Sequence, residues 1–336
     1  MSTIKDVARV AGVSIATVSR VYNGSLQVRE STRQHVREIA IQLDYSPHGA
    51  ARSLIMSETR TLGALLPDLY GEFFSEVIRG IDQTAQKHGF HLLVSSSHAH
   101  RPSLEAAIRS MRGRVDGLIV MSPERYAQPP RRAGAARRLP IVLLNSPAEG
   151  EGVDVITIAN VEGARSMVAH LIGRGHRRIG IIGGAAHNID AEERLQGYRN
   201  ALRDAGLEPD ARYEVTGDFS EKSGYSAAFE LADRDPRPTA IFAANDAMAI
   251  GALSALRSRG LRIPEEIAVA GFDDIPMARY VDPPLSSVHV NISALGARAA
   301  ERLLFAIRHA TTHAPQRETL PTTLVLRGST EGTTVQ

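Results

Sequence analysis

The sequence predicts two parts of different fold class: an N-terminal all-α helix-turn-helix domain with a short hinge helix, and a larger two-lobed α/β body. Short helical patterns separated by turn-forming residues fill residues 1 to about 57. From residue 60 onward, apolar β-like runs alternate with helical periods over roughly 230 residues, more than one open sheet usually holds. The length of 336 residues exceeds a single domain of about 100–200 residues, which favours two or three folding units.

The composition excludes several classes of protein. A hydrophobic fraction of 43% and a charged fraction of 23% are ordinary for a globular protein, and no run of about 18 uncharged apolar residues could cross a bilayer. Because the chain has no cysteine, disulfides, thiolate metal sites and a cysteine nucleophile are excluded. The N-terminus lacks the apolar core of a secretory signal, so we expect a soluble, cytoplasmic protein. The net charge of +2 is too small to indicate nucleic-acid binding by itself.

The first two expected helices form a compact motif. Thr3 and Asp6 have the spacing of an N-terminal capping pair, and apolar residues recur at helical spacing up to Ala11. Gly12 breaks this helix, and Ser14 opens a second one over residues 15–22. Two helices joined by a four-residue turn that contains glycine match the helix-turn-helix pattern.

Two more helices complete the N-terminal part. A helix over about Glu30 to Leu43 presents one apolar stripe that can close a small core over the first two. After Pro47 forces a boundary, residues 48–55 can form a short hinge helix before the linker 56–59. Isolated helices under about 12–15 residues are marginal in water, so we expect the hinge helix to fold only on binding.

The alternation of apolar runs and helical patterns predicts a series of βαβ units in the body. The expected strands are Thr61–Leu66, His91–Ser95, Gly117–Met121, Ile141–Asn145, Val155–Ile158, Arg178–Gly183, Ala240–Ala243 and Ala268–Phe272, with helices near 74–88, 103–112, 163–174, 195–205 and 247–259. Ligands of such parallel sheets bind beyond the carboxyl ends of the strands. In a two-lobed body those ends would face a cleft between the lobes.

Several motifs, taken in order, carry a resemblance to a known family. They are TIKDVA (3–8), GVSIATVSRV (12–21), YSP (45–47), AARSL (50–54), GRGHRRIG (173–180), RLQGY (194–198), NDAMAIG (245–251) and GFDD (271–274). In these stretches the chain resembles the lactose-repressor/galactose-repressor (LacI/GalR) family of transcriptional regulators over nearly its whole length. The resemblance implies a body similar to a type I periplasmic binding protein, in which the chain crosses between the lobes three times.

Domain boundaries follow from the patterns and the resemblance together. We expect a helix-turn-helix domain at 1–46, a hinge helix and linker at 47–59, and an effector-binding and dimerisation domain at 60–336. Lobe 1 would comprise about 60–159 and 291–320, and lobe 2 about 160–290 and 321–331, with crossings near Asn160, His289–Asn291 and Leu320. Only seven residues follow the expected final strand, too few for a tetramerising leucine heptad, so we expect a homodimer.

The second helix is expected to read double-stranded DNA, because an α-helix fits the major groove with its N-terminal residues facing the bases. Geometry and resemblance assign Ile15, Ala16 and Arg20 to the base edges, with Arg20 donating two bonds to a guanine. The expected phosphate contacts are Ser14, Thr17, Ser19, Asn23, Thr32 and Arg52. Ser14 and Thr17 are explained equally well as helix caps. The resemblance implies that Leu54 wedges between base pairs in the minor groove of a palindromic operator.

The resemblance also implies an effector cleft. Its expected residues are Phe73 or Phe74 from the first lobe, and Asp190, Arg194, Phe219, Asn245 and Asp273 from the second. Carboxylate, amide and guanidinium groups can hydrogen-bond the hydroxyls of a polyol, and an aromatic face covers the apolar side of a sugar ring. The alternative for the phenylalanines is a place in the core, where most phenylalanines lie.

These observations predict a sequence-specific DNA-binding regulator, a repressor of carbohydrate-utilisation genes released by a sugar inducer, with no cofactor, no metal and no catalytic activity. A corepressor-dependent regulator that responds to a non-sugar metabolite is the alternative. An enzyme is disfavoured, because the glycines at 180–184 match neither phosphate-binding fingerprint and the histidines lack metal-binding spacing. A transport-type sugar receptor would share the body but not the N-terminal helix-turn-helix.

Overall fold

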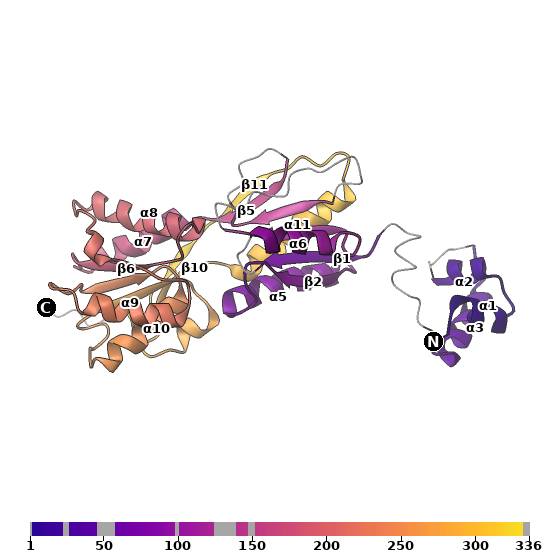
Figure 1. Ribbon diagram of the computed structural model, residues 1–336, viewed down its shortest axis with the longest axis horizontal. Coiled ribbons are helices and arrows are strands. Elements are labelled where there is room, and N and C mark those ends of the chain that lie inside the picture. The colour runs from indigo at the N-terminus through magenta and orange to yellow at the C-terminus, as the bar shows by residue number, and fades with distance from the viewer. Residues whose placement is uncertain are drawn as a thin grey trace. The chain divides into compact units, whose positions relative to one another are not determined.

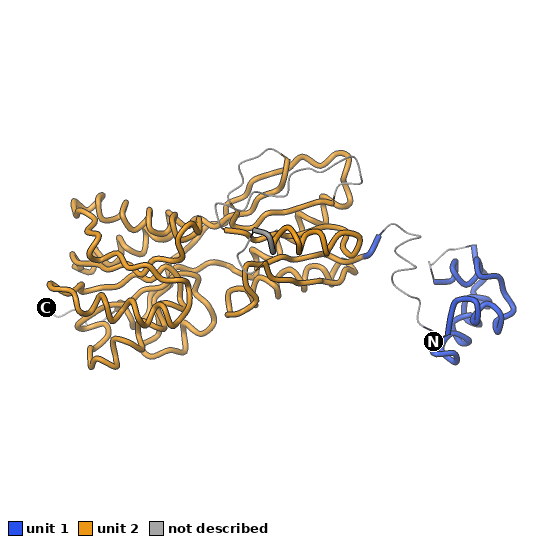
Figure 2. The backbone as a smooth tube through the Cα atoms, in the orientation of Figure 1, with its two compact units in different colours: residues 1–59 blue, residues 60–336 orange. Residues whose placement is uncertain are grey.

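The structure is a computed structural model that describes residues 2–22, 27–45, 58–97, 101–123, 139–146 and 152–331. The chain divides into two compact units, an N-terminal unit of residues 1–59 and a body of residues 60–336 (Figure 2). Each unit is described by itself. No helix of the described residues is both long and apolar enough to span a membrane.

The N-terminal unit is a three-helix bundle of α1 (Ile4–Val10), α2 (Ile15–Tyr22) and α3 (Glu30–Gln42). Its small core is built around Val7, Val18 and Val36, none of which is exposed to solvent. Gly12 has a φ of +67°, which glycine adopts without steric cost, and this ends α1 and turns the chain into α2. The hinge helix expected at 48–55 lies outside the described residues.

The first lobe of the body contains a wholly parallel six-stranded sheet (Figure 1). Its order is β11 (Arg317–Leu320), β5 (Asp154–Ile158), β4 (Ile141–Leu144), β3 (Gly117–Met121), β1 (Thr61–Leu66) and β2 (His91–Ser96). Alternate strand residues face opposite sides. One side packs on α5 (Glu72–Lys87) and α11 (Ile292–Arg308), and the other packs on α6 (Arg101–Met111).

The second lobe repeats this plan with one antiparallel edge strand. Its order is β12 (Thr323–Val325), β10 (Ser286–His289), β9 (Ala268–Asp273), β8 (Ala240–Ala243), β6 (Ile179–Gly183) and β7 (Glu214–Thr216). Helix α7 (Asn160–Gly173) packs against α8 (Ile189–Asp204), and α9 (Glu221–Ala232) packs against α10 (Asp246–Ser258). Two short 3₁₀ helices, η1 (Ala211–Tyr213) and η2 (Pro276–Arg279), complete the lobe.

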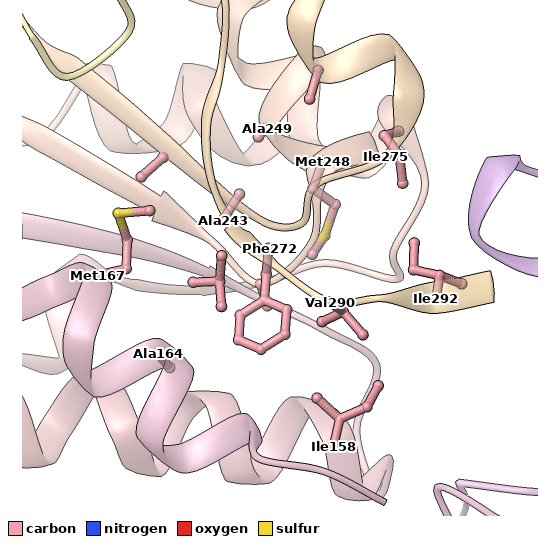
Figure 3. Close-up of a cluster of buried hydrophobic side chains, with 14 of the residues drawn as sticks. Ile158, Ala164, Met167, Ala243, Met248, Ala249, Phe272, Ile275, Val290 and Ile292 are labelled. Carbon is pink, nitrogen blue, oxygen red and sulfur yellow. The ribbon is translucent and has the colours of Figure 1, made fainter. Parts of the chain in front are cut away.

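The chain passes between the two sheets three times. It leaves the first sheet after β5 and enters α7, returns after β10 into α11, and leaves again between β11 and β12. Apolar side chains pack where these passages meet, among them the buried Ile158, Val290 and Ile292 (Figure 3). One hydrophobic core therefore runs through both lobes.

The sequence patterns single out neither β7, α9, β10 nor α11, and the reason is clearest for α9. A Cβ atom on Gly251 of α10 would lie 2.0 Å from the carbonyl oxygen of Glu221, and one on Gly224 of α9 would lie 2.1 Å from that of Met248. The two helices thus approach backbone to backbone through small residues. The buried face of α9 carries the small residues Gly224, Ala227 and Ala228 besides Leu231, and small residues give little periodic signal.

Candidate effector cleft and DNA-reading helix

The carboxyl ends of strands from both lobes meet at a cluster of buried polar residues. Asn145 follows β4 in the first lobe, and Asp273 ends β9 in the second. Asp190 and Arg194 lie in the first turns of α8. This helix begins six residues before the expected one, because the side chain of Asn188 caps it by accepting a hydrogen bond from the Ala191 N–H at 3.1 Å. The amide of Asn145 donates to Asp190 at 3.4 Å, and the Ile189 N–H donates to the carbonyl of Pro123 at 2.9 Å. These bonds join the two lobes.

Arg194 is the centre of the cluster and is only 3% exposed. Its Nε donates to Oδ1 of Asn160 at 2.9 Å, and its Nη1 donates to the carbonyl of Ala244 at 2.6 Å. Nη2 lies 3.2 Å from Oδ1 of Asp273, and the guanidinium carbon lies 3.7 Å from the ring centre of Phe272. An arginine fixed on this many sides holds a rigid array of donors.

The two carboxylates beside Arg194 have perturbed acidity. Burial raises the pKa of Asp190 to about 6, against the opposing effect of Arg194 and a 2.8 Å bond from the Asn160 amide. Burial raises the pKa of Asp273 to about 7, again opposed by Arg194 and assisted by the negative charge of Asp190. Both groups therefore titrate close to neutral pH, as carboxylates in functional sites frequently do.

Two buried oxygens of the cluster accept no hydrogen bond from any described residue. They are Oδ1 of Asn145 in the first lobe and Oδ1 of Asp273 in the second. The Oδ1 of Asp273 does have an ion-pair partner, because it lies 3.2 Å from Nη2 of Arg194. Buried acceptors are nearly always satisfied in folded proteins, so each of these oxygens can accept a hydrogen bond from a ligand or a water molecule.

The three expected aromatic residues are half-buried rather than fully in the core. Phe73 and Phe74, at the start of α5, meet edge to face with 5.5 Å between ring centres. The Phe219 ring lies over Gly184, where a Cβ atom would come 2.1 Å from its Cζ atom. Phe219 also has a φ of +71°, a strained conformation for a bulky residue and one that recurs at functional sites.

Asn245 has a structural role that the sequence reasoning missed. Its Oδ1 accepts from the Met248 N–H at 3.0 Å and caps α10, and its Nδ2 donates to the carbonyl of Phe219 at 3.0 Å. Asn245 thus holds Phe219 in position, and its contact with an effector remains a prediction.

Asn145 and Asn160 are cleft residues that the sequence reasoning did not assign. The sequence marks Asn160 only as a crossing point between the lobes. In the structure its amide donates to both Asp190 and Glu193, and its oxygen accepts from Arg194. Asn145 could have been found, because it is the polar residue at the carboxyl end of an expected strand. No sequence signal reveals the position of Asn160, which depends on the packing of α7 against α8.

The N-terminal unit presents three of the expected DNA contacts on one helix. Ile15, Ala16 and Arg20 of α2 are all exposed. Ser14 caps the helix by accepting from the Thr17 N–H at 3.0 Å, and the hydroxyl of Thr17 lies 2.9 Å from that of Ser14. Their phosphate contacts remain predictions.

The other expected DNA contacts are placed only in part. Ser19 and Thr32 are half-buried. Asn23, Arg52 and Leu54 lie outside the described residues.

A helix-turn-helix unit joined to a two-lobed body with a polar cleft defines a ligand-responsive transcriptional regulator. Comparison with known families agrees. Residues 3–48 match the model for bacterial regulatory proteins of the lacI family, and residues 168–330 match the periplasmic binding protein-like domain.

Relatives extend the match to nearly the whole chain. The ribose operon repressor of Escherichia coli K12 is 36% identical over 98% of this chain and all of its own length. The HTH-type transcriptional repressor PurR of Vibrio cholerae is 37% identical over 92% of each protein. The chain belongs to the lacI family of bacterial regulatory proteins, and it is a sequence-specific DNA-binding regulator rather than an enzyme.

Solved structures share the same fold. The complex of the transcriptional regulator CelR with cellobiose has a TM-score of 0.74 and 34% identity, and covers 98% of this chain and all of its own. The lac repressor dimer bound to operator and the anti-inducer ONPF has a TM-score of 0.87 and 28% identity, and covers 98% of this chain and 99% of its own.

Proposed function

We propose that this regulator represses carbohydrate-utilisation genes and that a sugar bound in the cleft releases it from the operator. The observation that carries this proposal is the pair of buried oxygens on Asn145 and Asp273, one from each lobe, that accept no hydrogen bond from the described residues. A sugar presents several hydroxyl donors around one small ring. A single sugar could therefore satisfy both oxygens and bridge the lobes.

The rest of the cleft supports the same ligand class. Arg194 can donate to a ring or hydroxyl oxygen, and Phe219 with Phe73 or Phe74 can cover the apolar faces of the ring. Two carboxylates stand beside one arginine, which disfavours a phosphorylated sugar or another anion. The printed names of two relatives also point to sugars, since one is a ribose operon repressor and another is bound to cellobiose.

The proposal includes a homodimer on a palindromic operator, acting in the cytoplasm where such DNA lies. The N–H of Met277 in η2 donates to Oε2 of Glu72 in α5 at 2.9 Å, which places Leu69 and Tyr70 near η2. Tyr70 and Tyr280 are 74% and 76% exposed. Large exposed apolar side chains near one another favour burial by a second copy, and a related protein, the lac repressor, is a dimer on its operator.

The test uses the full chain. An operator is first selected from a random-sequence DNA library, and calorimetry then measures binding of ribose, cellobiose and a purine base. One sugar should bind and lower operator affinity about 5–150-fold, the usual range of allosteric coupling. If the purine tightened operator binding and neither sugar had an effect, the protein would be a corepressor-dependent regulator and the proposed induction would be wrong. An asymmetric selected site would contradict the two-fold dimer.

A further inference from the structure

Charge is distributed unevenly between the two units of the chain. Residues 1–59 carry seven Lys and Arg and five Asp and Glu, an excess of only two positive charges for the unit that holds DNA. Residues 60–336 carry 32 of each, so the body has no formal net charge. A basic surface on the body must therefore be a local concentration of side chains.

The parallel sheet of the first lobe gathers the amino ends of six strands at one face, opposite the cleft. Thr61 pairs with His91, Leu62 with Gly117, and Arg317 with Val155. The carbonyl of Arg60 accepts from the His91 N–H at 2.9 Å, which fixes the two strand starts side by side. Helices α5, α6 and α11 all end at this face, which we call the basic end face.

Basic side chains are concentrated there. Six exposed Lys and Arg residues lie at or next to the start of a strand or the end of a helix at this face: Arg60, Lys87, Arg112, Arg114, Arg308 and Arg317. His88, His91 and His309 are exposed beside them, with Arg308 3.3 Å from His88.

The described acidic side chains at this end are fewer than the basic ones. Of the described acidic residues at this end, Asp116 accepts from the Arg60 N–H at 2.7 Å, and Asp154 is buried against His313. Glu58 is exposed. Among the described residues, no carboxylate forms an ion pair with Lys87, Arg112 or Arg114.

Part of this charge has a local role, because cations near a helix C-terminus stabilise the helix dipole. Lys87 and Arg308 are in the last turns of α5 and α11 and fit that role. Arg112 directly follows the last residue of α6 and fits that role as well. Arg114 lies further along the chain, and Arg60 and Arg317 stand at strand starts, where no helix dipole explains them. The charge at this face thus exceeds what helix stability requires.

The chain enters the body at this same face, at Arg60 (Figure 2). The segment from residue 46 to residue 59 can span at most about 50 Å, even when fully extended. DNA held by the N-terminal unit is consequently tethered to the body and has a raised local concentration around it. Operator DNA is therefore the polyanion that the linker brings close to the body.

We propose that the basic end face of the first lobe is a second DNA-contact surface, which binds the phosphate backbone that flanks the operator without reading its sequence. It supplements the sparse charge of the N-terminal unit. The proposal rests on the regulator binding an operator, as argued above, and adds that affinity depends on DNA beyond the palindrome.

The experiment compares two duplexes that carry the selected operator. One is about 20 bp long and holds the palindrome alone, and the other adds 12 bp of arbitrary sequence on each side. Fluorescence anisotropy over 50–300 mM salt should show tighter binding and a steeper salt dependence for the longer duplex. In the triple variant Lys87→Ala, Arg112→Ala and Arg114→Ala, affinity for the longer duplex should fall at least tenfold. Its salt slope should fall by up to about 2.7 for each protomer that contacts a flank, since each phosphate contact contributes about 0.9.

A control variant removes two positive charges elsewhere on the body. Arg203→Ala with Lys222→Ala changes two exposed residues of the second lobe and should leave both duplexes unaffected. Equal binding of the two duplexes by the wild type, or equal losses in the control, would overturn the basic end face as a DNA surface. Failure to select any operator would instead contradict the proposed function, while intact binding of the short duplex by the triple variant shows that the protein is folded.

Discussion

Replacing Asp273 with asparagine removes an ionisable group from the cleft while keeping nearly the same side-chain shape. The carboxyl is 4% exposed, and burial raises its pKa from 3.8 to about 7. Below pH 3.8 the group is protonated in both the folded and the unfolded chain. As the pH rises toward 7, the unfolded chain ionises freely while the folded protein retains its proton, so this carboxyl progressively destabilises the fold. Above pH 7 the loss of folding stability caused by this carboxyl reaches its full value.

The magnitude follows from the size of the shift. At about 1.4 kcal/mol per pKa unit, the loss has an upper limit of about 4 kcal/mol. The amide of the substituted asparagine cannot titrate, so the melting temperature of Asp273→Asn should decline less than that of the wild type between pH 5 and pH 8. The difference should reach several degrees, since 1 kcal/mol corresponds to about 2–4 °C for a unit of this size. Calorimetric melting of both proteins at four pH values measures it.

The same variant tests the cleft. Loss of a charged acceptor for a sugar hydroxyl costs about 1.5–3 kcal/mol, or about 10–150-fold in the dissociation constant. Operator affinity without sugar should be unchanged, because residue 273 belongs to the body. Parallel melting curves at every pH, or a wild-type response to the sugar, would refute the assignment of Asp273.

Three further substitutions separate the other parts of the protein. Arg20→Ala should cost about 1–3 kcal/mol on the operator and relax preference at one base pair, and an equal loss on scrambled DNA would make Arg20 a phosphate contact instead. Leu54→Ala should weaken operator binding in gel shifts while calorimetry shows unchanged sugar affinity; reduced sugar affinity would count against a minor-groove wedge. Gly184→Ala should displace the Phe219 ring and weaken sugar binding with operator affinity retained, and normal sugar binding would remove Phe219 from the site.

The sequence alone determined the two fold classes and most of the strands. Apolar runs such as Gly117–Met121 and Ala240–Ala243 are buried along their whole length, so their composition directly reports their place in the middle of a sheet. Helices α2 and α3 could also be predicted from the sequence, because their signals are local. Gly12 and Ser14 lie just before α2, and the apolar residues of each helix recur every three to four positions.

Only the tertiary structure decided how the cleft residues are connected. Asn145 and Asp190 are 45 residues apart in the sequence, and the bond between them exists because two sheets place their carboxyl ends together. The raised pKa values of Asp190 and Asp273 likewise depend on burial, which no local pattern encodes. Asn245 shows the same limit, since its residue type fits both a ligand contact and a helix cap, and only the position of the Met248 N–H established the cap.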